Sequence, residues 1–112
     1  KSLAFHSGID MASRRRAPVR VTSRGVVAFV GWKGGFGKMV EVDHGLGVRT
    51  RYAHLSAIFV KRGQEVDFRD KVGLVGSTGR SSGEHLHYEI LVDGRQNDPS
   101  NFMKAGQYVF KN

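Results

Sequence analysis

Two histidines that lie two residues apart, His85 and His87, are the residues of this sequence best suited to chemistry. In a β-strand, alternate side chains project from the same face, so both histidines would face one way. Leu86, Tyr88 and Ile90 would then face the other way and anchor the strand to a core. Two histidines on one face of an otherwise apolar strand are costly to bury unless something binds them. A metal ion is the simplest explanation.

A second pair of potential ligands lies near the start of the chain, at His6 and Asp10. If this segment is extended, both side chains lie on a common side, with Gly8 between them. The sequence has no cysteine, so His, Asp and Glu are the only strong ligands available. Two imidazoles and one carboxylate leave a position open for water, which favours hydrolysis. The same ligand types form the facial triad of non-haem iron oxygenases, so ligand identity alone does not determine which metal is bound.

The elements that must position these residues are short strands. Fifteen glycines separate runs rich in Val, Phe, Tyr and Thr, and no long apolar pattern of period 3.6 is present. This pattern predicts an all-β domain, with a hairpin around residues 44–47 and one short helix after Asp98-Pro99. The expected strands are residues 26–30, 38–43, 48–54, 72–75 and 85–92.

Length and composition predict one domain that spans residues 1–112, because 112 residues with 39% hydrophobic content fit a single core. The chain lacks an initiator Met and reaches an informative motif by residue 6, so we expect a piece of a longer protein. No run approaches the roughly 20 apolar residues of a membrane span, and no signal peptide is recognisable.

The chain is basic, with 18 Lys and Arg against 10 Asp and Glu and a formal net charge of +8. This charge attracts polyanions of any kind. The densest cluster is Arg14-Arg15-Arg16, and the remaining basic residues are scattered without a recognition helix or an RNA-binding signature. We therefore expect no nucleic-acid partner, and a solvated basic loop that helps the domain approach anionic polymers of a cell envelope.

Three motifs in one order carry a family resemblance: residues 6–10 (HSGID), 52–56 (YAHLS) and 83–90 (GEHLHYEI). Together they resemble the LytM and lysostaphin type of zinc metallopeptidase. The resemblance continues through residues 25–27, 37–40, 43–45, 63–64 and 75–80 and covers nearly the whole chain. Any one motif alone is a weak signal, whereas three in order are highly specific.

The resemblance implies a role for each of five residues. His6, Asp10 and His87 match the zinc ligands, and His54 and His85 match the two histidines that flank the metal-bound water. The implied fold is mostly antiparallel β-structure with an open groove across the metal. The present chain would be one such domain, lacking a few residues at its N-terminal end.

The implied activity is that of a zinc metalloendopeptidase with one Zn²⁺ per chain. It would hydrolyse stem or bridge peptides of bacterial peptidoglycan by attack of a zinc-bound water. Its place would be the cell envelope, in the periplasm or on the outer face, with any anchoring segment outside these 112 residues. The oligomeric state is left open.

Three further residues are assigned from local pattern. Tyr52 shares strand parity with His54, and we assign it to the substrate groove. Tyr88 faces away from the metal side of its strand and belongs in the core. His44 precedes a glycine-rich hairpin turn, where a solvated role is favoured.

The chain departs from the family pattern at three positions. Arg16 and Arg69 stand where Gly is common, and each would cost of order 1 kcal/mol if its position requires positive φ. Glu84 replaces a frequent Pro and adds a carboxylate near the site.

Rival functions come from other classes. Some relatives with the implied fold are non-catalytic regulators that activate other wall hydrolases after losing zinc ligands, and retention of all five site residues argues against that role here. A wall-binding or polyanion-binding module would instead use the basic surface. An iron oxygenase is the third rival, and a dependence on oxygen or a 2-oxo acid would identify it.

Overall fold

The computed structural model describes residues 3–4, 8–12, 16–79 and 85–96, and it describes side chains for residues 16–79 and 85–95. Within these ranges the chain is mostly antiparallel β-structure with almost no helix, which confirms the all-β prediction. The strands are β1 (Leu3–Ala4), β2 (Gly8–Ala12), β3 (Pro18–Arg20), β4 (Gly25–Trp32), β5 (Lys38–Gly45), β6 (Val48–Ile58), β7 (Glu65–Val66), β8 (Lys71–Val75), β9 (His85–Val92) and β10 (Arg95–Gln96).

All five predicted strands are present, as β4, β5, β6, β8 and β9. The predicted helix after Asp98-Pro99 lies outside the described residues. A single 3₁₀ turn, Gly34–Phe36, joins β4 to β5. In the described part of the chain, no helix has the length and apolar character needed to cross a membrane.

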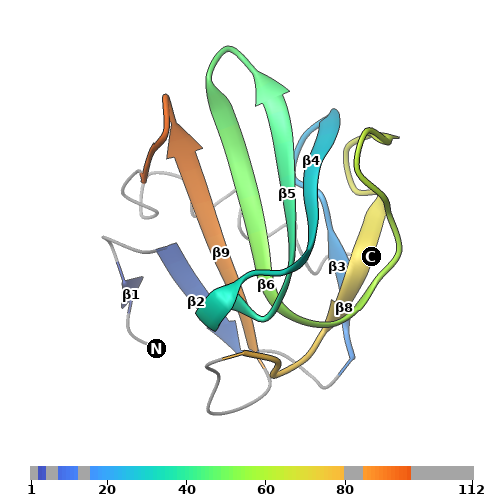
Figure 1. Ribbon diagram of the computed structural model, residues 1–112, viewed down its shortest axis with the longest axis vertical. Coiled ribbons are helices and arrows are strands. Elements are labelled where there is room, and N and C mark those ends of the chain that lie inside the picture. Colours follow the sequence, from blue (N-terminus) through green and yellow to red (C-terminus); the bar gives the residue numbers. More distant parts are fainter. Residues whose placement is uncertain (1–2, 5–7, 13–15, 80–84, 97–112) are drawn as a thin grey trace.

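The strands form one curled sheet in which neighbours run antiparallel (Figure 1). The main path is β1-β2-β9-β6-β5-β4-β7, while β10 pairs with β9, and β8 joins β3 to β6. The predicted hairpin joins β5 to β6 through Gly45 and Gly47, which have φ of 84° and 78°. These are left-handed conformations that glycine adopts without a steric penalty.

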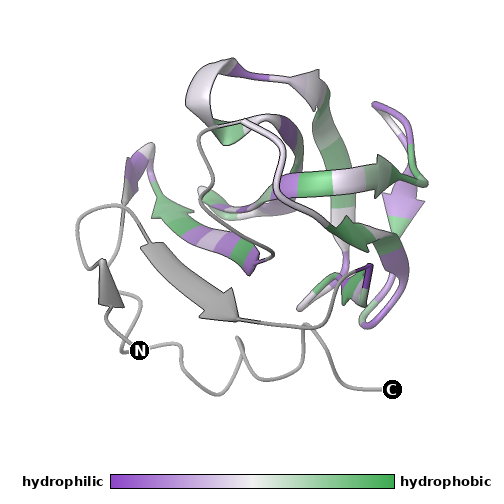
Figure 2. Cartoon of the chain, turned by 90° about the horizontal axis from the view of Figure 1, so that it is seen from below, coloured by the Kyte–Doolittle hydropathy of each residue, from purple (hydrophilic) through white to green (hydrophobic). Residues whose placement is uncertain are grey.

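The core lies between the central strands and the β3–β8 pair. Along the first part of β9, hydrophobic and hydrophilic residues alternate (Figure 2), and the strand ends in three hydrophobic residues, Ile90, Leu91 and Val92. Leu86, Tyr88 and Ile90 are buried in the core as predicted, so the odd-numbered side chains of β9 face the other side of the sheet. Burial of an aliphatic side chain such as Leu86 or Ile90 contributes about 1.5–3 kcal/mol to the free energy of unfolding. The core residues are Ala17, Val19, Val21, Val27, Val40, Val42, Tyr52, Leu55, Val66, Val72, Val75, Leu86, Tyr88 and Ile90.

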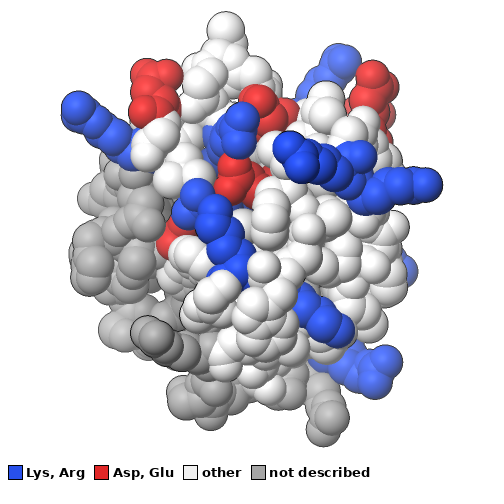
Figure 3. Space-filling view, in the orientation of Figure 1, with Lys and Arg blue, Asp and Glu red and all other residues white. Residues whose placement is uncertain are grey.

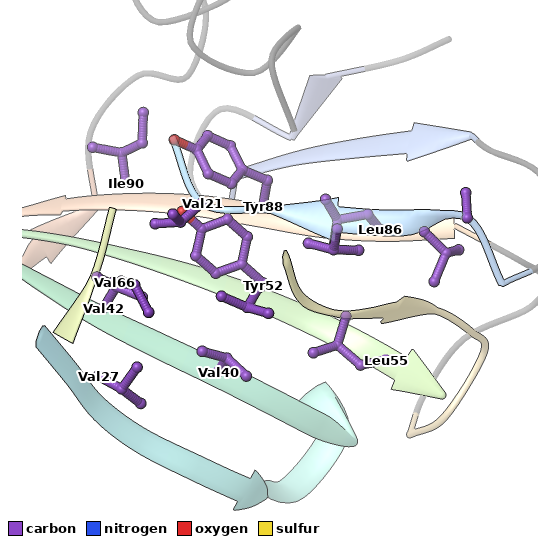
Figure 4. Close-up of a cluster of buried hydrophobic side chains, with 14 residues drawn as sticks. Val21, Val27, Val40, Val42, Tyr52, Leu55, Val66, Leu86, Tyr88 and Ile90 are labelled. Atoms are coloured by element: carbon purple, nitrogen blue, oxygen red, sulfur yellow. The ribbon is translucent and has the colours of Figure 1, made fainter. Parts of the chain in front are cut away.

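Two tyrosines form the polar centre of this core. The rings of Tyr52 and Tyr88 lie side by side in Figure 4, with centroids 5.4 Å apart. The Tyr52 hydroxyl lies 2.8 Å from Thr50 Oγ1 and accepts a hydrogen bond of 3.3 Å from the backbone N–H of Thr22. The Tyr88 hydroxyl lies 3.0 Å from Thr22 Oγ1. These bonds satisfy hydroxyl groups that burial would otherwise leave without water.

The assignment of Tyr52 to the substrate groove is wrong, because its side chain is 0% exposed and lies in the core. The register pairs Tyr52 with Val40 but Leu55 with Lys38, so between these pairs β6 has one residue more than β5. This β-bulge resets the alternation of side chains along β6. Tyr52 and His54 therefore do not share a face, although they are two residues apart.

The two arginines that stand where glycine is common in the family, Arg16 and Arg69, both have positive φ in the structure. Arg16 has a φ of 61° and Arg69 a φ of 70°. Glycine adopts these angles freely, whereas a residue with a Cβ atom meets a steric penalty of about 1–2 kcal/mol. Both positions therefore store strain in the loops that flank the sheet.

Replacement of Tyr52 by Phe should lower the free energy of unfolding by about 1–2 kcal/mol, because the buried Thr50 hydroxyl and the half-buried backbone N–H of Thr22 each lose a partner. Urea unfolding measures this change. Tyr88→Phe removes a hydroxyl whose hydrogen bond in the described residues is to Thr22 Oγ1, and it should cost less. Equal stability of wild type and Tyr52→Phe would contradict the bonding described.

Replacement of Arg16 by Gly should raise the free energy of unfolding by about 0.5–1 kcal/mol, because relief of backbone strain exceeds the added flexibility of the unfolded chain. Arg62→Gly is the matched control, since Arg62 is also exposed but does not have positive φ. That control should lose stability. Equal losses in the two variants, measured by urea unfolding, would refute the strain at residue 16.

Candidate metal and catalytic site

Three of the predicted site residues come together on the polar side of the sheet. The ring centroid of His54 lies 5.1 Å from that of His85 and 6.0 Å from that of His87. His54 comes from the second half of β6, and the other two come from the start of β9. The core residue Leu86 separates His85 from His87 in sequence and points to the opposite face. The structure thus brings these three histidines together.

His54 owes its position to the β-bulge in β6. Its φ is 62°, an unusual value for a residue other than glycine, and its side chain is largely buried, with the residue 7% exposed. Bulges frequently re-aim a side chain beside an active site. The backbone strain of about 1–3 kcal/mol must be offset by the surrounding structure. At His54 the chain thus carries a strained conformation that turns the imidazole towards the two histidines of β9.

The His54 ring is oriented by Thr78. Its Nδ1 atom lies 2.7 Å from the carbonyl oxygen of Thr78. A carbonyl only accepts, so Nδ1 donates, and in the neutral ring Nε2 carries the lone pair. Thr78 itself is fixed, because its hydroxyl donates to the carbonyl of Leu55 at 2.7 Å and accepts from the N–H of Lys38 at 3.1 Å.

Two glycines allow the Thr78 loop to approach the β4–β5 turn. A Cβ atom on Gly37 would lie 2.5 Å from the carbonyl carbon of Thr78, and one on Gly79 would lie 2.4 Å from the nitrogen of Gly37. Such distances exclude any larger residue without a shift of the backbone. Thr78 was not predicted from the sequence, because its role comes from a backbone carbonyl that no side-chain pattern marks.

His85 begins β9 and is half-buried. Its backbone N–H donates to the carbonyl of Gly76 at 3.3 Å, and its ring meets that of His54 at an interplanar angle of 61°. The neighbouring Glu84, which the sequence analysis singled out, lies outside the described residues. His85 therefore stands at the edge of the described site.

His87 is 8% exposed, and its Nε2 atom lies 3.0 Å from Oε2 of Glu89. The centroid of the Phe36 ring, from the β4–β5 turn, lies 6.0 Å from that of the His87 ring. Histidines that bind metals commonly donate one ring N–H to a carboxylate and use the other nitrogen for the ion. His87 therefore fits the role of a metal ligand.

The other two predicted ligands are described less fully. The register of β2 with β9 places Asp10 directly opposite His87. His6 lies outside the described residues, as does the side chain of Asp10. Among the residues that the structure describes, no group of three or more His, Cys, Asp or Glu is placed to hold a metal ion. The full ligand set and the open groove stay predictions.

A chain of ion pairs on two buried carboxylates, Glu89 and Glu41, extends across the same face of the sheet. Arg51 donates to Glu89 at 3.1 Å and to Glu41 at 2.8 Å, and Arg49 donates to Glu41 at 2.7 Å. Figure 3 shows acidic and basic side chains intermixed near the middle of this face. This network was not predicted from the sequence, although Glu89 shares the strand face of His87 by simple alternation.

The prediction of a solvated His44 is wrong. This residue is half-buried, its Nδ1 lies 2.9 Å from the carbonyl of Arg24, and its Nε2 lies 2.7 Å from Thr50 Oγ1. Thr50 in turn contacts the Tyr52 hydroxyl, which belongs to the core. His44 thus has a structural role and remains outside the site, as the sequence analysis also proposed.

The charge state of Glu41 links this network to pH. Burial opposes its ionisation, but the hydrogen bonds from Arg49 and Arg51 outweigh that effect and hold the pKa of Glu41 below its ordinary value of 4.5. A carboxylate with a lowered pKa in the folded state stabilises the fold above its unfolded pKa. That contribution is lost as pH falls through the folded pKa.

We therefore expect wild type to lose more stability than Glu41→Gln when the pH is lowered from about 6 to about 3, a range that contains the Glu titration. The amide keeps the shape of the side chain but cannot be protonated in this range. Urea unfolding at each pH measures the difference. Equal losses in both proteins would show that the two arginines do not hold Glu41 ionised.

The sequence profile of Peptidase family M23 matches residues 4–99. One curated relative is the peptidoglycan DD-endopeptidase ShyA of Vibrio cholerae, which is 45% identical over 105 residues. That match covers 94% of this chain and 24% of the relative. The chain thus spans about a quarter of the length of this relative.

Two solved structures share the fold. The zinc-containing peptidase from Vibrio cholerae aligns with a TM-score of 0.80 and 41% identity, over 84% of this chain and 29% of that chain. The catalytic domain of lysostaphin from Staphylococcus simulans aligns with a TM-score of 0.83 and 33% identity, over 88% of this chain and 79% of that chain. The resemblance to lysostaphin-type peptidases is confirmed, and this chain belongs to peptidase family M23.

Proposed function

We propose that this chain is the catalytic domain of a zinc metalloendopeptidase that hydrolyses peptide cross-links of bacterial peptidoglycan. The observation that carries the proposal is the cluster of His54, His85 and His87 on the polar face of the sheet. The relative from Vibrio cholerae is named a peptidoglycan DD-endopeptidase, and a structural neighbour is described as zinc-containing. Both descriptions support this assignment.

The metal would be held by His6, Asp10 and His87. Two nitrogen donors and one oxygen donor suit zinc and leave a coordination position open. The backbone register of Asp10 with His87 supports this set, as does the bond from His87 to a carboxylate. When bound, zinc supplies Lewis-acid polarisation and lowers the pKa of water to about 7.

His54 and His85 would handle the protons of the reaction. Because His54 donates Nδ1–H to Thr78, the lone pair of the neutral ring is on Nε2, which would accept a proton, and the carbonyl would then stabilise the charged ring. His85, whose ring centroid lies 5.1 Å from that of His54, would donate a hydrogen bond to developing negative charge. A positioned general base of this kind typically contributes a factor of about 10²–10⁴.

The positive charge of the chain is consistent with a substrate that lies among anionic polymers. A net charge of +8 would draw the domain towards anionic polymers of the envelope. Peptidoglycan as substrate places the domain in the periplasm or on the outer face of the cell. We take residues 1–112 as one domain of a longer protein, whose other segments would supply any anchor.

The test combines zinc content with release of soluble muropeptides from purified peptidoglycan. Wild type should hold about one zinc ion per chain and release muropeptides. His87→Ala should lose both the metal and the activity. His54→Ala should keep its zinc and lose about 10²–10⁴ in rate, because it removes proton transfer alone.

Tyr52→Phe is the control, since Tyr52 lies in the core and should leave cleavage intact. A wild-type chain that is folded, metal-free and inactive would refute the peptidase and favour a regulator of other wall hydrolases. Binding to peptidoglycan that survives His87→Ala, with no cleavage by wild type, would favour a wall-binding module.

A further inference from the structure

Glu89 is a carboxylate that the proposed reaction does not use, yet it is 1% exposed and bonded to His87. A buried charge requires partners that offset the loss of water. We infer that Glu89, held in place by Arg51, is a positioning residue that fixes the ring tautomer of His87 for metal binding. This inference rests on the proposed zinc site.

The register of the sheet brings the three residues together. β6 pairs with β9 so that Arg51 lies opposite Glu89 and Ala53 lies opposite His87. The two carboxylate oxygens of Glu89 then take different partners. Oε1 accepts from Nη1 of Arg51 at 3.1 Å, and Oε2 accepts from Nε2 of His87 at 3.0 Å. One carboxylate thus connects a fixed cation to the imidazole.

The bond to Glu89 determines which ring nitrogen of His87 carries hydrogen. An ionised carboxylate only accepts, so Nε2 of His87 must be the donor. A neutral imidazole has a single N–H, and Nδ1 therefore carries the lone pair. A metal ion requires such a lone pair, and a carboxylate behind the ring also raises the basicity of the ligand.

Arg51 is itself prevented from turning away. Its Nε atom donates to Glu41 at 2.8 Å, and its guanidinium lies 5.7 Å from the centroid of the Phe36 ring. Glu41 is bonded in turn by Arg49. Because guanidinium has donors and no acceptor, whatever atom of residue 89 faces Arg51 must be an acceptor.

This restriction makes Glu89→Gln informative. The amide oxygen should face Arg51, so the amide NH₂ should face Nε2 of His87. Because NH₂ donates, Nε2 would have to accept, and the ring hydrogen would move to Nδ1. The lone pair would then point away from the metal position. We expect the affinity for zinc to fall by about 10–100-fold, as changes behind metal ligands typically do.

The double variant Glu89→Gln with Arg51→Met supplies the sharper test. Without the guanidinium, the amide can rotate and present its oxygen to His87, which restores the original tautomer. Zinc affinity should therefore recover towards the wild-type value, although a second residue has been changed. Two merely structural losses would add or worsen. Arg49→Met is the matched control. Arg49 also bonds Glu41, but its other ion-pair partner is Asp43 and not Glu89.

The measurements are the dissociation constant of Zn²⁺, by competition with a chromogenic chelator, and the ring ¹⁵N shifts of His87 in the metal-free protein. Wild type and Arg49→Met should show hydrogen on Nε2, and Glu89→Gln should show it on Nδ1. Hydrogen on Nδ1 in metal-free wild type would overturn the inference without any variant. Thermal unfolding of each metal-free protein checks that it is folded.

Different results would overturn the role of Glu89 and the proposed zinc peptidase. A wild-type chain that binds zinc and releases muropeptides, while Glu89→Gln binds zinc equally well, would overturn the role of Glu89 and leave the peptidase intact. A wild-type chain that binds no zinc would overturn the metal site and, with it, the purpose assigned to the tautomer.

Discussion

The pairing of β6 with β9 is the constraint on which both faces of this domain depend. Three consecutive residue pairs alternate between the two sides of the sheet, because successive strand residues point to opposite faces. Arg51 opposite Glu89 and Ala53 opposite His87 lie on the polar side, and Tyr52 opposite Tyr88 lies in the core. A slip of one residue would bury the charges and expose the tyrosines. The apolar packing of one face therefore holds the chemical groups of the other in register.

Period-2 alternation accounts for what the sequence predicted well. Runs of β-forming residues between glycines located β4, β5, β6, β8 and β9, and alternation separated His85 and His87 from the buried Leu86 and Tyr88. It failed for Tyr52, because a β-bulge adds one residue to β6 and no local signal in the sequence marks that insertion. The short strands β3, β7 and β10 were missed for a related reason, since two or three residues are too few to display a period.

The surroundings of the histidines could not be predicted, because they come from residues distant in sequence. The Thr78 carbonyl reaches His54 from 24 positions away, and Arg51 reaches Glu89 from 38 positions away. Residues that can bind a metal are recognisable in a sequence by their type, whereas the groups that orient them are ordinary carbonyls and ion pairs. The network also explains how Glu41 and Glu89 remain buried, since each is paired with arginine at hydrogen-bonding distance.

The contact between Gly37 and Gly79 has a consequence for how this domain can diversify. The two segments that border the histidines touch backbone to backbone, so neither can gain a side chain at that point without displacing the other. The carbonyl that orients His54 belongs to the same junction. Natural or engineered variation in these segments must therefore occur away from the junction, by insertion or substitution nearer their tips. A side chain added to either loop at this junction would therefore require a shift in the other loop.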